Sequence, residues 1–297
     1  MRIVVTGCSG QVALSLAERA RERPDLDVVT VGRPHLDLAR RESILPALER
    51  HRPDLVVSAA AYTAVDQTED EPDLAFAVNA VGAGAVAEAA ACLGVPVIHL
   101  STDYVFDGFK EGNYAEDDAT APLNVYGASK LAGEKAVAAA NPRHIILRTA
   151  WVYSPFGKNF VKTMLQLAEN REEIPVVADQ WGNPSSAPDI ADAVFKTAAF
   201  LIRSRQNEIS GVYHLAGTGT VNRADFARHI LSVSRARGGP WSRVRSVTTE
   251  EFPARARRPA NSSLSTARFA ATFGWTMPDW QHSIESTIER LVQAKHG

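Results

Sequence analysis

The sequence predicts an α/β fold in which a doubly wound parallel sheet carries a smaller, discontinuous C-terminal domain. Three observations lead to this prediction. Short apolar runs alternate with helical patterns through the first half of the chain. A glycine-containing turn follows the first of these runs. After Trp151 the alternation becomes irregular, and loops separate the remaining helical patterns.

The strands of the predicted sheet are short, rich in β-branched residues and apolar at consecutive positions, as expected for strands that are covered on both faces. They are Arg2–Thr6, Asp27–Val31, Asp54–Ala60, Pro96–Ser101 and His144–Thr149. Helical patterns lie between them, at Val12–Glu22, Leu74–Leu93 and Lys130–Ala140. The last of these helices must begin near Asn124 or Val125, just after Pro122.

The second half predicts a helix over Asp189–Ile202 and a strand over Gly211–Gly217 that can return to the main sheet. We therefore expect residues 1–165 to form a cofactor-binding domain to which residues 187–216 return. Residues 166–186 and 217–297 are expected to form a second, smaller domain that binds the substrate.

Composition excludes several classes of protein. The formal net charge of -2 argues against a nucleic-acid or anionic-membrane partner. Two cysteines form no disulfide framework and fit a reducing cytoplasm. No apolar run reaches about 18 residues, and the chain opens on a strand-like segment, so we expect neither a membrane span nor a signal peptide.

The first strand runs into the turn "TGCSGQVA", which holds Gly7, Gly10 and Ala13. A glycine turn between a strand and a helix lets backbone N–H groups approach a pyrophosphate at the helix N-terminus. The alternative is a plain strand-to-helix turn made of small residues. The position at the first strand favours nucleotide binding.

The loop after the second strand bears on the choice of nicotinamide cofactor. It offers Gly32 and Arg33, and no acidic residue before Asp37. An acid at this point suits the ribose hydroxyls of NAD, whereas an arginine suits the 2′-phosphate of NADP. Arg33 therefore favours NADPH, although a solvated loop arginine is the alternative. Asp37 can contact the adenine side or cap the following helix.

Tyr126 and Lys130 lie four residues apart, so they share one face of the predicted helix. A nearby ammonium group is expected to stabilise a phenolate and to lower the tyrosine pKa towards working pH. Thr102, at the end of the fourth strand, can fix a carbonyl oxygen for proton donation by Tyr126. The alternative is that Tyr126 packs and Lys130 is a surface charge, but the three positions together favour proton transfer.

Several blocks, in order along nearly the whole chain, resemble the dTDP-4-dehydrorhamnose reductases, a branch of the extended short-chain dehydrogenases with a Rossmann fold. They are "TGxxGxxA", "STDYVFDG", "PLNVYGASKLAGEKAV", "ILRTAWVYSPFGKNFVKTML", "DQWGNPSSA" and "RRPANSSL". The resemblance implies reduction of the 4-keto group of dTDP-4-dehydro-L-rhamnose by NADPH, and in some members also by NADH. The product, dTDP-L-rhamnose, is a donor for cell-surface polysaccharide.

The resemblance also implies roles for single residues. Tyr126 becomes the proton donor, Lys130 its electrostatic partner and ribose ligand, and Thr102 the residue that orients the keto oxygen. The expected cofactor-binding residues, besides Tyr126 and Lys130, are Gly7, Ser9, Gly10, Gln11, Val12, Arg33, Asp37, Leu38, Ala59, Ala60 and Ala61, with Tyr62 close by. The expected substrate-binding residues, besides Thr102, are Asp103, Tyr104, Trp151, Asn159 and Arg258.

Some of these assignments have alternatives. Trp151 can equally be a core residue. In "PARARRPANSSL", Arg257 or Arg258 can pair with the substrate diphosphate or belong to a solvated basic loop. Ser58 stands where the family more often has asparagine.

Metal binding is where the sequence departs from the family. Some members are magnesium-bridged dimers that use glutamates, and the matching positions here are Ser15, Pro188 and Arg290. These residues offer no carboxylate cluster to a hard cation. We therefore expect no metal requirement and a monomer or weak homodimer.

Two other functions remain open. The chain can reduce another nucleotide 4-keto-deoxysugar, because no single residue reports the stereochemistry at the keto carbon. It can also be a non-catalytic regulatory subunit, as is a reductase-like partner of methionine adenosyltransferase, although a scaffold has no need of Thr102, Tyr126 and Lys130. A dehydratase is disfavoured, because Tyr104 stands where those enzymes carry a glutamate base.

Overall fold

The computed structural model describes residues 1–203 and 207–294. Six parallel strands form the main sheet in the order β10-β5-β4-β3-β1-β2. They are β1 (Arg2–Thr6), β2 (Asp27–Val31), β3 (Leu55–Ser58), β4 (Val97–Thr102), β5 (His144–Thr149) and β10 (Gly211–His214). The order reverses beside β1, which is the doubly wound arrangement that the sequence predicts.

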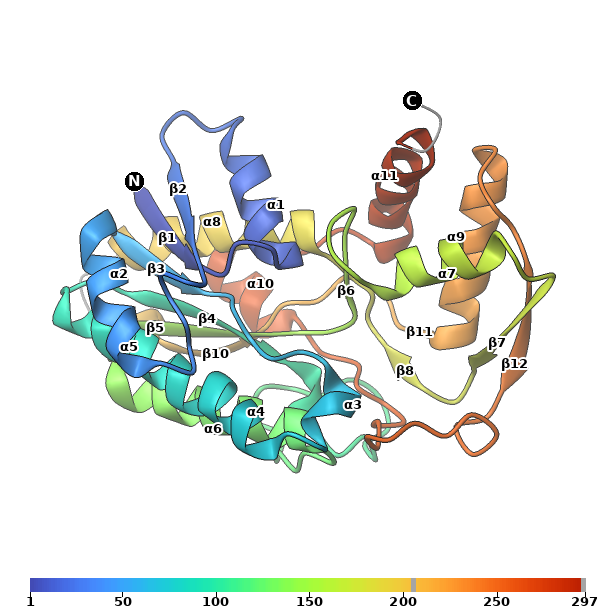
Figure 1. Ribbon diagram of the computed structural model, residues 1–297, viewed down its shortest axis with the longest axis horizontal. Helices are drawn as coiled ribbons and strands as arrows, with labels where there is room; N and C mark the ends of the chain where they lie inside the picture. Colours follow the sequence, from blue (N-terminus) through green and yellow to red (C-terminus); the bar gives the residue numbers. More distant parts are fainter. Residues whose placement is uncertain (204–206, 295–297) are drawn as a thin grey trace.

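Helices cover both faces of this sheet (Figure 1). One layer holds α1 (Gln11–Ala20), α8 (Ala187–Arg203) and α10 (Ala267–Phe273). The other holds α2 (Ile44–His51), α5 (Ala83–Cys92) and α6 (Val125–Ala140). Two buried apolar clusters fill the spaces between these layers and the sheet, which accounts for the fully apolar strands.

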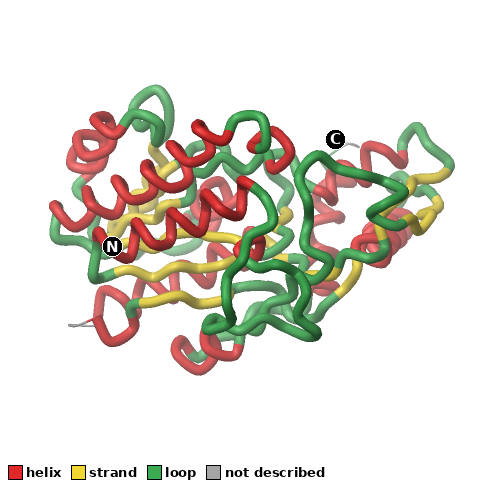
Figure 2. Tube along the Cα trace, turned by 90° about the horizontal axis from the view of Figure 1, so that it is seen from below, coloured by secondary structure: helices red, strands yellow, loops and turns green. Residues whose placement is uncertain are grey.

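A smaller lobe lies beside the carboxyl edge of the sheet, on the right in Figure 1. Its helices are α7 (Phe160–Ala168), α9 (Arg223–Ala236) and α11 (Trp280–Gln293), and they share one apolar cluster. Its paired strands are β7 (Glu173–Val177) with β12 (Arg243–Val247), and β8 (Trp181–Gly182) with β11 (Val221–Asn222). Figure 2 shows the same two lobes joined by loops.

The remaining elements are short. They are η1 (Arg41–Ser43), α3 (Val65–Thr68), α4 (Pro72–Phe76), η2 (Ala77–Gly82), η3 (Asp103–Val105), β6 (Val152–Tyr153), β9 (Ser185–Ser186) and η4 (Asn207–Ile209). β6 and β9 pair with each other where the two lobes meet.

The predicted strands and the return of β10 to the main sheet are confirmed. β3 ends two residues earlier than expected, because the N–H groups of Ala59 and Ala60 donate to the Thr6 hydroxyl, each at 3.1 Å, instead of extending the ladder. Two segments pack outside the expected domain boundaries. α7 belongs to the cluster of the smaller lobe, and α10 packs against the main sheet. The division into two domains stays a prediction.

The helix expected over 74–93 is interrupted by the π-helical turn η2. Asn79 on this turn uses its side chain to bond the backbone N and O of Tyr62, at 2.8 and 3.0 Å, and the Ser129 hydroxyl, at 3.0 Å. The whole stretch Pro72–Cys92 is long and apolar enough to cross a membrane, which the sequence analysis did not expect. Most of it is buried, and it packs against α2 and α6 as a core element.

Candidate active site

The candidate catalytic residues gather at the carboxyl edge of the main sheet, next to the smaller lobe. Thr102 ends β4, Trp151 follows β5 and Gly7 follows β1. Tyr126 lies in the first turn of α6, whose N-cap Asn124 accepts a hydrogen bond from the Gly127 N–H at 2.8 Å. In open α/β sheets, ligands bind outside this edge near the point where the strand order reverses.

The glycine turn has the geometry of a phosphate cradle. Gly7 has φ 95°, a conformation that favours glycine. A Cβ atom on Gly10 would meet nothing within 4 Å, so the approach to the start of α1 is open. No side chain caps this helix start, and its first turn holds no acid. The residues present therefore fit the pyrophosphate of a dinucleotide.

The other expected cofactor residues differ in what their side chains do. Arg33 is exposed, whereas Leu38 is buried and packs on Gly82. Asp37 does not cap a helix, which corrects one alternative; its carboxylate accepts from the N–H of Ala39 at 3.0 Å within a turn. Gln11 donates to the Val152 carbonyl at 3.4 Å and so ties the start of α1 to β6. Ser9 and Val12 flank this position in the turn and the first turn of the helix.

The phenol of Tyr126 lies close to the Thr102 hydroxyl. The residue keeps part of its surface exposed, but protein surrounds the phenol group. Its ring packs edge-on against Tyr104, with ring centroids 5.9 Å apart. Burial, together with the nearby Asp103 and Tyr104, raises the pKa of Tyr126 above its usual range. The lowered pKa that the sequence analysis expected is therefore wrong for this structure.

Lys130 does not lower that pKa because its ammonium group has other partners. Its Nζ donates to the Leu100 carbonyl at 2.7 Å and lies 3.3 Å from Nε2 of His99. Burial lowers the pKa of Lys130 to about 8, and the carboxylate of Glu134 opposes that shift. His99 Nδ1 lies in turn 3.1 Å from the hydroxyl of Ser58, which gives Ser58 a hydrogen-bonding role at the end of β3.

Asp103 is buried beside Thr102, at 3% exposure. Its Oδ1 accepts a hydrogen bond from the Thr102 hydroxyl at 2.9 Å. Its Oδ2 is buried and has no hydrogen-bond partner in residues 1–203 and 207–294. The Ser262 hydroxyl is near this carboxyl but donates to the Trp181 carbonyl at 3.3 Å. Burial raises the pKa of Asp103 to about 6, against the opposing effect of nearby hydrogen-bond donors.

Two guanidinium groups lie near the hydroxyl of Tyr104, those of Arg223 and Arg258. Arg258 was expected here, and it also forms an ion pair with Asp66 at 2.7 Å. Arg223, the first residue of α9, was missed. Its guanidinium stacks on Trp151, 3.6 Å from the ring centroid. The only sequence signal for it is an arginine directly after the N-cap of α9, a common surface position.

Trp151 and Asn159 link the site to the smaller lobe. Trp151 has φ 45°, packs on Phe226 and supports Arg223. Asn159 caps α7 by accepting from the Lys162 N–H at 3.1 Å. Its amide also donates to Gln11 Oε1 at 3.0 Å, so in this structure its side chain joins the two lobes.

The sequence profile described as the RmlD substrate binding domain matches residues 1–293. The chain belongs to the RmlD substrate binding domain family. A dTDP-4-dehydrorhamnose reductase of Sinorhizobium fredii (strain NBRC 101917 / NGR234) is 50% identical over 292 residues, which cover 98% of each chain. This relative and the matched profile confirm the family resemblance seen in the sequence blocks.

Solved structures agree with this membership. A dTDP-4-dehydrorhamnose reductase from Clostridium acetobutylicum ATCC 824 has a TM-score of 0.91 and 34% identity, over 98% of this chain and 99% of that one. The reductase from Bacillus anthracis str. Ames, solved in complex with NADP, has a TM-score of 0.90 and 36% identity, over 97% and 99%. The doubly wound fold is thus shared with RmlD-family reductases.

Within this RmlD-family chain, the three positions considered for magnesium have other roles. The Ser15 hydroxyl is buried and donates to the Gln11 carbonyl at 2.8 Å. Pro188 lies in the first turn of α8. Arg290 pairs with Glu18 at 2.6 Å and stacks on Phe156, 4.9 Å from the ring centroid. In residues 1–203 and 207–294, no three acidic, histidine or cysteine side chains gather as a metal site.

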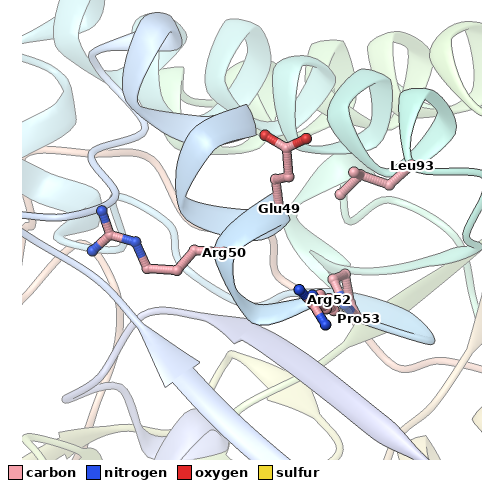
Figure 3. Close-up of a pocket in the computed structure, with 5 residues that line it drawn as sticks. All are labelled: Glu49, Arg50, Arg52, Pro53 and Leu93. Atoms are coloured by element: carbon pink, nitrogen blue, oxygen red, sulfur yellow. The ribbon is translucent and has the colours of Figure 1, made fainter.

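A surface hollow of about 520 Å³ lies away from all of these residues (Figure 3). It is lined by Glu49, Arg50, Arg52, Pro53 and Leu93. Glu49 and Arg50 lie near the end of α2, Arg52 and Pro53 come between α2 and β3, and Leu93 directly follows α5, all at the amino edge of the sheet. The hollow therefore lies at the opposite edge from the candidate active site.

Proposed function

We propose that the chain reduces the 4-keto group of dTDP-4-dehydro-L-rhamnose to give dTDP-L-rhamnose, with NADPH as the reductant. The observation that carries this proposal is the placement of the Tyr126 phenol beside the Thr102 hydroxyl at the end of β4, on the same sheet edge as the open glycine turn. The names of the relatives support the same substrate. We place the enzyme in the cytoplasm, in keeping with its two free cysteines.

Bound NADPH supplies the hydride for this reaction. Gly7, Gly10 and the start of α1 would hold its pyrophosphate, and Arg33 would select the 2′-phosphate. The chain's own residues supply the proton. Thr102 orients the keto oxygen, and Tyr126 donates its phenolic proton to that oxygen as the alcohol forms.

Lys130 contributes charge rather than a proton. Its pKa of about 8 keeps most of the amine protonated at neutral pH. In this structure its Nζ donates to the carbonyl of Leu100. We propose that the same ammonium group serves as the ligand of the nicotinamide ribose when the cofactor is bound.

Arg223 and Arg258 are suited to the anionic part of the substrate. Their guanidinium groups both lie near the Tyr104 hydroxyl. A diphosphate needs such cationic, multidentate donors. We propose that this pair attracts the diphosphate of the nucleotide sugar, while the 4-keto group lies towards Thr102 and Tyr126.

The test is NADPH oxidation by the purified protein with a panel of 4-keto sugar nucleotides, followed by NMR of each product. We expect the highest kcat/KM with dTDP-4-dehydro-L-rhamnose and a single configuration at C4. Faster turnover of another 4-keto-deoxysugar nucleotide would reassign the substrate. NADPH binding with no oxidation on any of them would instead indicate a regulatory subunit.

A further inference from the structure

The phenol of Tyr126 lies close to the Thr102 hydroxyl. That hydroxyl donates in turn to Asp103 at 2.9 Å. The Thr102 oxygen also accepts from the Tyr104 N–H at 3.1 Å, which fixes its position. A hydroxyl has one proton to give and two lone pairs that accept. The Thr102 hydroxyl therefore stands between the Tyr126 phenol and the Asp103 carboxyl, where it can pass a proton from one to the other.

The two carboxyl oxygens of Asp103 have unequal hydrogen-bonding environments. One carboxyl oxygen is committed to Thr102, and the other is buried without a hydrogen-bond partner in the described residues. An unpaired, buried carboxylate oxygen is costly, and protonation removes that cost. The groups that face Asp103 are Arg223 on α9, Tyr126 on α6, Tyr104, and Ser262 on the loop before α10. Their balance leaves its pKa at about 6, where it can take up and release a proton near neutral pH.

Lys130 and His99 offer a second possible path by which a proton could return to Tyr126. The Lys130 ammonium faces the Leu100 carbonyl and His99, and both Lys130 and His99 are almost fully buried. Burial and the neighbouring charge of Lys130 hold the pKa of His99 well below its usual range. That histidine is therefore a poor carrier of a proton at neutral pH.

We propose that Asp103 returns a proton to Tyr126 through the Thr102 hydroxyl after each reduction. This inference rests on the proposed function. As the keto carbon is reduced, the Tyr126 proton passes to the keto oxygen, giving the alcohol and a phenolate. Thr102 then gives its hydroxyl proton to the phenolate and takes the carboxyl proton of Asp103. The Asp103 carboxylate regains a proton from solvent, so one proton is consumed for each NADPH oxidised.

The test compares wild type with Asp103→Asn, which keeps the shape and the acceptor oxygen but carries no acidic proton. Enzyme in excess over dTDP-4-dehydro-L-rhamnose is mixed with saturating NADPH in weakly buffered solution with a pH-indicator dye. NADPH absorbance reports reduction, and the dye reports proton uptake. Asp117→Asn, on an exposed surface carboxylate, is the matched control.

In wild type and Asp117→Asn we expect proton uptake to keep pace with NADPH oxidation. In Asp103→Asn the first oxidation needs no proton from residue 103, because Tyr126 starts protonated. Proton uptake should then lag behind oxidation by roughly tenfold or more. Asp103→Ala gives the same comparison if a buried amide prevents folding.

Two results would overturn the proposal. Proton uptake that keeps pace with oxidation in both Asp103 variants would assign the return of the proton to another route, such as the Lys130 side. If NADPH oxidation in the Asp103 variants slowed as much as proton uptake, Asp103 would be a residue that positions the substrate and not a proton donor. Failure of the proposed function is distinct, because wild type itself would then oxidise no NADPH with this substrate.

Discussion

Gly127 lies against the backbone carbonyl of Tyr104 so closely that a Cβ atom on Gly127 would overlap that oxygen. The same holds for Gly133 farther along α6, against the carbonyl of Asn79 in the π-helical turn. The two glycines let α6 approach the end of β4 and the neighbouring helix. The close packing of α6 against these two carbonyl groups therefore determines the position of Tyr126.

Gly127→Ala should destabilise the protein and lower turnover. In an exposed helix the same change stabilises by up to about 1 kcal/mol. Here the added methyl group meets backbone, and overpacking of this kind costs about 1–3 kcal/mol. Chemical denaturation and steady-state kinetics check the prediction. A stabilised variant with wild-type turnover would show that the close approach does not place Tyr126.

Asp103 should make stability depend on pH. Burial raises its pKa from 3.8 to about 6, so between these values the native state binds more protons than the unfolded state. The free energy of unfolding therefore falls as pH rises through this window, and the loss is complete above about pH 6. Asp103→Asn removes the effect, and at about pH 8 it should be more stable than wild type by up to about 3 kcal/mol.

The measurement for this prediction is the urea midpoint of both proteins at about pH 4 and about pH 8. The gain of Asp103→Asn over wild type should be small at the lower pH and large at the higher one. An equal gain at both values would mean that the carboxyl titrates in the native state as it does in the unfolded chain.

Arg33→Ala should weaken NADPH binding by roughly tenfold, as expected for the loss of one hydrogen bond to a charged group. NADH binding should stay nearly unchanged, because NADH has no 2′-phosphate. Fluorescence titration of both cofactors checks this. Arg50→Ala, an exposed arginine at the opposite sheet edge, serves as the control. Equal losses for both cofactors would show that Arg33 does not read the 2′-phosphate.

Chelation should leave activity and oligomeric state unchanged. Ser15, Pro188 and Arg290 offer no carboxylate, and Arg290 is already paired with Glu18. A protein-bound Mg²⁺ needs one or two carboxylates plus waters. The check is turnover and sedimentation with and without EDTA. Activity lost in EDTA and restored by magnesium would point to a carboxylate set elsewhere, with Asp189 and Glu289 as the first to mutate.

The sheet and the position of Tyr126 were predictable from local signals. Apolar runs specify buried strands, and Asn124 directly after proline and leucine marks a helix start. The π-helical turn was not predictable, because it is accompanied by tertiary hydrogen bonds from Asn79 to Tyr62 and Ser129. The sequence between 74 and 93 reads as one helix.

The electrostatics of the site could not be read from spacing alone. Four-residue spacing puts Tyr126 and Lys130 on one face, but the direction of the Lys130 ammonium depends on the carbonyl of Leu100. Arg223 lies near Tyr104 because α9 of the smaller lobe, far along the chain, begins next to Trp151. Such contacts appear only when the two lobes are assembled.

The central claim is that Tyr126 donates the proton in the reduction of a 4-keto sugar nucleotide, and Tyr126→Phe tests it most directly. The variant keeps the ring and its packing on Tyr104 but loses the donor. With saturating NADPH and dTDP-4-dehydro-L-rhamnose, kcat should fall by about 10²–10⁴-fold while NADPH affinity stays near that of wild type. A kcat within a few-fold of wild type would contradict the account and remove Tyr126 from the mechanism.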